Sequence, residues 1–240
     1  MKVTSVEPQK TLRLRSGRRF NVILDGQFAF GSDEDLVVDH RLVVGKILDT
    51  SELEKLLFEA EVGKLMERMY GLFNLRLRSE KEVRDYLKNL SFKRKVKEQG
   101  EISEAAVELL IDKLKQKGLL NDEQFAKAWV ESRRKTKKKG KIALKQELYQ
   151  KGINRDLIVE VLKDSTPESE EQLAIQALEK KMRIWKILPI MELSEKSLRD
   201  LRKKAYEFLM RRGFEYEVVR DVIEKMAKRE YNINRESDRE

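Results

Sequence analysis

The side chains best suited to binding chemistry form a run of cations in the middle of the chain. Seven of nine consecutive residues are basic: Arg133, Arg134, Lys135, Lys137, Lys138, Lys139 and Lys141. Like charges this close repel one another, and a solvated helix face usually intersperses acids among them. The group would suit nucleic-acid phosphates or an acidic protein surface. We predict a binding surface here; the alternative is that the cations serve solubility and complement a helix dipole.

Three smaller basic groups are further candidates. One comprises Lys93, Arg94, Lys95 and Lys97, next to Phe92. For this group, a binding role and a merely solvated role are equally open. Arg76 and Arg78 form another candidate, near a predicted helix end. Arg211 and Arg212 precede Gly213 at a helix end, where cations are expected for structural reasons, so we predict a structural role for that pair.

The residue types that enzymes and metal sites use are scarce. The chain has no cysteine, so it offers no disulfide, no thiolate and no Cys/His ligand set for zinc. Its one histidine, His40, is expected at the surface. Gly140-Lys141 resembles the end of a phosphate-binding loop, but Lys135 stands where that motif requires glycine. We predict no catalytic residues, no metal and no cofactor, and an enzyme acting on nucleic acid is the remaining alternative.

Composition indicates long, exposed helices. Of 240 residues, 40% are charged and only three are proline, whereas about 25% charged residues is usual. The net charge is +9. No apolar run approaches the roughly 20 residues of a membrane span, and the N-terminus lacks the apolar core of a signal peptide. We expect a soluble, cytoplasmic protein that has no membrane partner.

The N-terminal part of the chain is β-prone, and the basic groups described above lie outside it. Residues 18–31 hold two short β-prone runs around Asp25-Gly26, a pair that favours a tight hairpin turn. Residues 3–6 could add a third strand. Ser32 is the predicted N-cap of a short helix that follows, with acids in its first turn.

Helical spacing governs the rest of the chain, from about Ser51. Ser79 and Glu82 predict a capping box. The main basic cluster follows a helix that begins with Asn121 as N-cap and Asp122 in the first turn. Its predicted core face comprises Phe125, Ala126, Trp129 and Val130. Acids at the start and cations at the end suit the helix dipole, but the cations exceed that need.

An internal repeat organises these helices. Residues 148–162 match 209–223 at constant spacing, with Gly152 aligned on Gly213 as a left-handed helix end. We predict a mainly α fold, an elongated curved array of three three-helix repeats with a small N-terminal β-hairpin extension. The predicted segments are 1–50 for the hairpin and short helix, 51–118, 119–164 and 165–230 for the repeats, and 231–240 for a frayed tail. The acidic stretch 164–171 is the predicted linker between the last two repeats.

Four motifs closely resemble the RecX regulatory protein family. They are "RLRSEKEVRDYL", "LKQKGLLNDEQFAKAWVESR", "KGKIALKQELYQKGI" and "FLMRRGFEYEVVRDVI". The segment "FNVILDGQFAFGSDEDLVV" is similar to the hairpin extension of many members, so the resemblance covers nearly the whole chain. It implies a chain of three-helix repeats in which Asp122, Phe125, Ala126 and Gly152 serve as cap, core and turn. Residues 88–101 depart from the family pattern, because this junction is longer and more basic than usual.

The resemblance also implies a function. It points to a non-catalytic modulator that binds the filament of RecA recombinase on single-stranded DNA, in DNA repair, recombination and the SOS response. We expect a monomer that inhibits RecA's ATPase and strand exchange, although the sequence leaves stimulation open. Single-stranded DNA would be contacted directly or through the filament. The alternative is a basic helical DNA-binding protein that acts without a recombinase.

Overall fold

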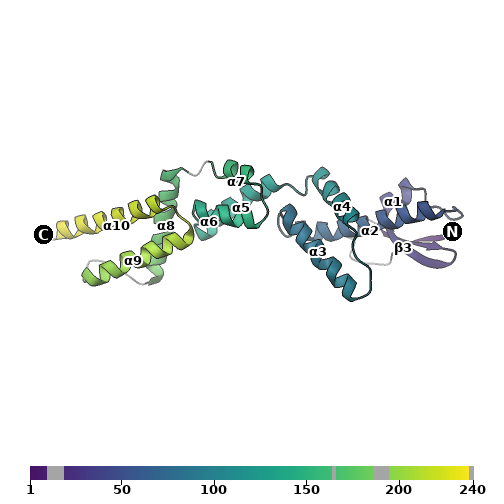
Figure 1. The fold of residues 1–240 in the computed structure, drawn as a ribbon, viewed down its shortest axis with the longest axis horizontal. Coiled ribbons are helices and arrows are strands. Elements are labelled where there is room, and N and C mark those ends of the chain that lie inside the picture. The colour runs from purple at the N-terminus through teal and green to yellow at the C-terminus, as the bar shows by residue number, and fades with distance from the viewer. Residues whose placement is uncertain (10–18, 164–165, 186–194, 238–240) are drawn as a thin grey trace. The chain divides into compact units, whose positions relative to one another are not determined.

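The protein is described by a computed structural model that covers residues 1–9, 19–163, 166–185 and 195–237 (Figure 1). The chain divides into two compact units, Met1–Asn121 and Asp122–Glu240, and each is described by itself. The first unit has a small sheet, a short helix and a three-helix group, and the described residues of the second unit form helices joined by turns. The prediction of a mainly helical chain with a small β-element at the N-terminus is therefore confirmed.

The N-terminal sheet has three antiparallel strands in sequence order. They are β1 (Val3–Pro8), β2 (Arg19–Leu24) and β3 (Gln27–Asp33). Asp25 and Gly26 form the β2–β3 turn with φ of 48° and 82°, because that turn requires positive φ at both positions. The hairpin and the third strand are as predicted.

The first helix, α1 (Glu34–Asp39), begins one residue later than predicted. Asp33 is its N-cap, since the Oδ1 atom of Asp33 accepts a hydrogen bond of 3.0 Å from the Leu36 N–H. Ser32 is fully buried within β3 instead. The prediction of Ser32 as N-cap is wrong because the strand continues up to the cap residue itself.

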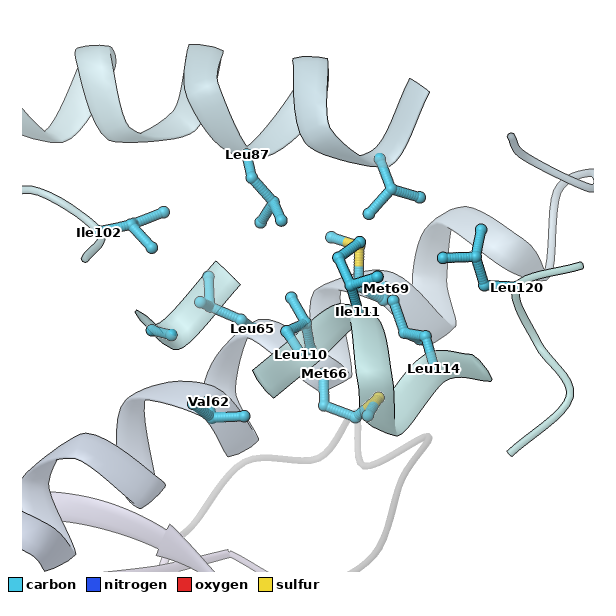
Figure 2. Close-up of a cluster of buried hydrophobic side chains, with 12 residues drawn as sticks. Val62, Leu65, Met66, Met69, Leu87, Ile102, Leu110, Ile111, Leu114 and Leu120 are labelled. Carbon is cyan, nitrogen blue, oxygen red and sulfur yellow. The ribbon is translucent and has the colours of Figure 1, made fainter. Parts of the chain in front are cut away.

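Helix α2 (Thr50–Phe73) is shared by two hydrophobic cores of the first unit. Its N-terminal half contributes Leu56 and Ala60 to the core beneath the sheet. Its C-terminal half contributes Leu65 and Met69 to a core formed with α3 (Glu80–Val96) and α4 (Glu104–Gln116). Figure 2 shows side chains from these helices meeting in that core, among them Leu87 of α3.

Local sequence signals set the ends of these helices. The hydroxyl of Ser79 accepts a 3.2 Å hydrogen bond from the Glu82 N–H, which confirms the predicted N-cap of α3. After α4, Gly118 has φ of 67°, the left-handed conformation that commonly ends a helix. Arg84 of α3 pairs with Glu108 of α4 and thus links the two helices through a bidentate contact.

Within its described residues, the second unit has two successive groups of three helices. They are α5 (Asp122–Lys137), α6 (Lys141–Gln150) and α7 (Arg155–Val161), then α8 (Pro167–Trp185), α9 (Glu195–Arg212) and α10 (Tyr216–Ser237). Side chains of α8, α9 and α10 share one core, in which Phe214, between α9 and α10, is fully buried.

Two boundaries in the second unit differ from the expectation. Helix α8 begins at Pro167, so most of the stretch 164–171 is helical rather than a linker. Proline favours the first helical turn, and the acids after it complement the dipole. Residues 164–165 lie outside the described part. Helix α10 continues to Ser237, into the segment expected to be frayed, and residues 238–240 lie outside the described part.

Candidate nucleic-acid interface

The main basic cluster occupies the end of α5, the turn after it and the start of α6. Lys135 and Lys137 on α5 are exposed, whereas the other five cations of the cluster are only partly exposed. Lys138 follows the helix with φ of 50° and redirects the chain toward α6. The seven cations therefore do not form one uniform surface, and their surroundings differ from residue to residue.

Arg133 belongs to a packed arrangement around Trp129. The Arg133 guanidinium lies 4.2 Å from the centroid of the Trp129 ring, a cation–π contact. Glu147 of α6 accepts a 2.9 Å hydrogen bond from Trp129 Nε1 and lies 2.9 Å from Arg133 Nε. Lys139 Nζ lies 3.5 Å from the other oxygen of Glu147. Arg133 of α5 and Lys139 of the turn after it thus both contact Glu147 of α6.

Arg134 reaches the third group of helices through Glu170 of α8. An Nη2 atom of Arg134 donates a 2.7 Å hydrogen bond to Glu170 Oε1. The other oxygen, Oε2, accepts a 3.0 Å hydrogen bond from the backbone N–H of Lys141, in the first turn of α6. The N-cap of α6 is Gly140, which has no side chain to cap the helix, so Glu170 supplies the missing acceptor.

Glu170 is almost fully buried, with 3% of its surface exposed. Burial raises the pKa of its carboxyl, because a charged group loses hydration there. The Lys141 N–H and the charge of Arg134 act in the opposite direction, and the nearby charge of Glu215 adds to the effect of burial. Arg134 therefore compensates a buried acid and is not free to meet a phosphate.

Gly140 fixes the same junction through its backbone. Its N–H donates to the carbonyl of Arg212 at 2.9 Å, and the Ile142 N–H donates to the carbonyl of Gly213 at 2.9 Å. A Cβ on Gly140 would lie 2.5 Å from the Gly213 carbonyl oxygen. Gly213, with φ of 81°, faces Ala143 so closely that its own Cβ would overlap that residue. The α9–α10 turn thus packs directly on the start of α6.

This packing brings exposed cations from distant parts of the sequence together. A hollow of about 430 Å³ is lined by Thr136, Lys137, Lys139, Phe208, Arg211 and Arg212. None of these described lining residues is acidic. Arg212 lies over the ring of Phe208 at 4.9 Å, and burial lowers its pKa. We name this feature the α5/α9 hollow.

The second cluster, at the end of α3, divides in a similar way. Arg94 pairs with Glu61 of α2 at 2.6 Å and is largely covered. Lys95 pairs with Glu101 at 2.6 Å, and the hydrogen bond to Glu101 raises its pKa. Lys93 and Lys97 remain exposed. These two side chains line a separate hollow of the first unit.

The third candidate pair is structural in its contacts. Arg76 donates two hydrogen bonds to the carboxylate of Glu82, at 2.7 and 3.0 Å. Arg78 is partly buried at the residue before the N-cap of α3. Neither Arg76 nor Arg78 lines the α5/α9 hollow or the hollow at the end of α3.

The motif residues of α5 and of the helix ends have structural surroundings. Phe125 and Ala126 are buried, and Trp129 stacks on Phe125 with 5.6 Å between ring centroids. Asn121 and Asp122 stand at the N-terminus of α5, as predicted. Gly152 and Gly213 have φ of 80° and 81°, which confirms the left-handed helix ends expected at both positions.

Sequence reasoning missed two contributors to this region. Arg211 and Arg212 were assigned to a helix end only, yet they line the α5/α9 hollow. Glu170 stood in a stretch interpreted as a linker, although it bonds both Arg134 and Lys141. The repeat could have given a signal, because Arg211 and Arg212 lie just before the glycine that aligns with Gly152.

The remaining candidate chemistry is limited. His40 Nε2 lies 2.8 Å from Glu59 Oε2, and its side chain is only partly exposed. Within residues 1–9, 19–163, 166–185 and 195–237, no group of three or more His, Cys, Asp or Glu side chains could hold a metal ion. None of the helices in that part of the chain combines the length and apolar character that a membrane span needs.

Comparisons with known proteins agree over nearly the whole sequence. The family model "Regulatory protein RecX N-terminal domain" matches residues 1–49, "RecX, second three-helix domain" matches 121–162, and "RecX, third three-helix domain" matches 168–223. The Regulatory protein RecX of Bacillus subtilis (strain 168) is 31% identical over 238 residues, which cover 99% of this chain and 81% of that protein. That of Clostridium perfringens (strain SM101 / Type A) is 27% identical over 230 residues, 96% of this chain and 98% of that protein.

Solved structures give a matching result. The protein described as "Crystal structure of regulatory protein RecX" superposes with a TM-score of 0.68 at 27% identity, over 92% of this chain and 98% of that one. RecX from Lactobacillus salivarius has a TM-score of 0.55 at 23% identity, which indicates a shared fold.

Proposed function

Because this chain belongs to the RecX family of regulatory proteins, we propose that it binds the RecA filament on single-stranded DNA and inhibits RecA's ATPase and strand exchange. The protein would act in the cytoplasm, as a monomer, in the control of DNA repair, recombination and the SOS response. The relatives are named as regulators, which agrees with the expectation of a non-enzyme.

The α5/α9 hollow is the observation that supports this proposal most directly. Lys137 comes from α5, whereas Arg211 and Arg212 come from α9, and the packing of two glycines holds the helices together. A nucleoprotein filament exposes phosphates and acidic protein surface, both of which suit such a group. Exposed Lys135 extends the same charge along α5. Four such contacts to single-strand phosphates predict a salt slope of about −3.

Inhibition would follow from contacts with several filament subunits at once. Exposed cations lie in both compact units of the chain, so two weak contacts can add through effective concentration. A ligand that binds one arrangement of subunits more tightly opposes any change away from it. ATP turnover in a filament requires such changes, so its rate would fall.

The test is the rate of DNA-dependent ATP hydrolysis by RecA, measured while the purified protein is titrated in. We expect the rate to fall at substoichiometric to stoichiometric ratios of protein to RecA. A rise in the rate would still indicate a regulator of RecA, but one that stimulates ATP hydrolysis rather than inhibits it. A rate unchanged at every ratio would overturn the proposal.

The alternative is a DNA-binding protein that needs no recombinase. Co-sedimentation separates the two functions, because filaments of RecA on DNA can be compared with DNA alone. Tight binding only when RecA is present supports the regulator. Equal affinity with and without RecA supports the alternative.

A further inference from the structure

Two large apolar side chains near the end of α3 are exposed to solvent. Phe92 has 67% of its surface exposed and Val96 has 69%. They lie four residues apart, so both project from the same face of the helix. Leu87 of the same helix belongs to the buried core with α2 and α4 (Figure 2), whereas neither Phe92 nor Val96 is part of that core.

Cations from two helices surround these side chains. A hollow of about 440 Å³ is lined by Lys64, Arg68, Leu90, Phe92, Lys93, Arg94, Val96, Lys97 and Gln99. None of these described residues is acidic. The 2.6 Å ion pair between Arg94 and Glu61 fastens the end of α3 to α2, so the hollow has a fixed wall. We name it the Phe92 hollow.

The other four cations of the Phe92 hollow remain available to a ligand. They are Lys64 and Arg68 on α2 and Lys93 and Lys97 at the end of α3. Within the described residues, no salt bridge engages any of the four. Lys64 and Arg68 are one helical turn apart, where like charges repel each other. A polyanion would relieve that repulsion.

We propose that the Phe92 hollow binds single-stranded nucleic acid directly, with an unpaired base stacked on the Phe92 ring and the flanking phosphates held by Lys64, Arg68, Lys93 and Lys97. An exposed aromatic ring beside cations offers the two interactions that sequence-independent single-strand binding uses. A duplex cannot supply the stacked base, because its bases are paired and stacked on one another. The site goes beyond the proposed function, since it requires no RecA.

The experiment measures the affinity of the full-length protein for a fluorescently labelled oligo-dT by anisotropy, without RecA. Phe92→Ala should weaken binding by about fivefold to about 150-fold, the loss expected for one stacked base. Phe92→Trp should retain affinity, and its added fluorescence should be quenched when DNA binds. Phe92→Leu keeps apolar bulk but has no ring, so it should lose affinity as Phe92→Ala does.

Phe28 provides a matched control. It lies in β3 of the same unit and is 66% exposed, almost the same as Phe92, but it does not line the hollow. Phe28→Ala should leave the affinity for oligo-dT unchanged. Replacing Lys64 and Arg68 together with Gln should reduce the salt slope by about 1.4, the value for two lost phosphate contacts on a single strand.

Three results would overturn the site. They are unchanged affinity in Phe92→Ala, full affinity in Phe92→Leu, and equal affinity of the wild type for oligo-dT and for a duplex of the same length. Loss of binding to phosphatidylserine vesicles in Phe92→Ala, with DNA binding intact, would assign the hollow to a membrane surface instead. None of these measurements contains RecA, so failure here is distinct from failure of the proposed regulation.

Discussion

Gly140 lies so close to Gly213 that a Cβ on Gly140 would stand 2.5 Å from the Gly213 carbonyl oxygen. The two residues are far apart in sequence and belong to different three-helix groups. The backbone of one group thus donates hydrogen bonds to the helix end of the next, at Gly140 and Ile142. A glycine that resembled part of a phosphate-binding loop is therefore a packing residue.

Gly140→Ala should destabilise the second unit by about 1–3 kcal/mol, the usual cost of forcing extra atoms into a packed contact. The measurement is chemical denaturation followed by circular dichroism. Gly71→Ala is the control, because Gly71 lies within α2 with open space around it. That substitution should stabilise by about 0.5–1 kcal/mol, since alanine favours helix. Equal effects of both substitutions would refute the close packing.

Glu170→Gln should change how stability depends on pH. Burial raises the pKa of Glu170 in the folded protein above the ordinary 4.5. Between the ordinary pKa and the raised pKa of the folded protein, the folded state binds more protons than the unfolded state. The contribution of Glu170 to stability therefore falls as pH rises. The free energy of unfolding of wild type minus that of Glu170→Gln should therefore decrease above about pH 4.5, then level off.

Denaturation at several pH values measures this difference. Glu168→Gln is the matched control, because it alters an exposed carboxyl in the same helical turn. A wild-type minus Glu170→Gln difference that rises with pH would mean that Arg134 and the Lys141 N–H outweigh burial.

Lys137→Glu combined with Arg211→Glu should abolish binding to the RecA filament while leaving helicity unchanged. The two side chains line the α5/α9 hollow from separate helices, so the double reversal removes its charge. Lys139 is left intact because it pairs with Glu147, and a carboxylate there would repel that partner.

Co-sedimentation with filaments measures the loss. The control variant, Lys145→Glu with Lys180→Glu, makes the same net charge change at exposed positions outside the hollow. Binding by the hollow variant would contradict the assignment. Equal loss in both variants would mean that net charge, rather than position, controls binding.

Gly152→Val should destabilise the α6–α7 junction by about 1–2 kcal/mol or more. Gly152 has φ of 80°, a conformation that places the Cβ of an L-residue against the following carbonyl. Gly152→Asn should recover part of the loss, since asparagine tolerates this region better. Thermal unfolding compares the three proteins, and a valine variant as stable as wild type would exclude the left-handed turn.

Local signals explain how much of the fold the sequence could predict. Asp25-Gly26 and Ser79 act on neighbouring backbone, so their turn and cap were foreseeable from a few residues. The prediction of Ser32 as N-cap was wrong by one position, because a strand end and a helix start compete for the same residues. The prediction of a linker at 164–171 was wrong because the polar composition concealed the start of α8. The buried Glu170 of that helix pairs with the distant Arg134.

The candidate site was less predictable for the same physical reason. Seven adjacent cations looked equivalent, but the carboxylates that engage Arg133 and Arg134 come from other helices. Arg211 joins Lys137 only after two glycine turns pack together. Sequence patterns identify which side chains carry charge, whereas tertiary contacts decide which of them remain exposed.

Helix α2 is one continuous helix that contributes side chains to two hydrophobic cores. Leu56 belongs to the core under the sheet, and Leu65 and Met69 belong to the core with α3 and α4. Backbone amides in the interior of the helix should therefore exchange slowly with deuterium in both its N-terminal and its C-terminal half. Removing residues 1–49 would expose the apolar face of α2 that packs beneath the sheet. Members of such a family that lack the sheet would therefore need polar side chains on that face.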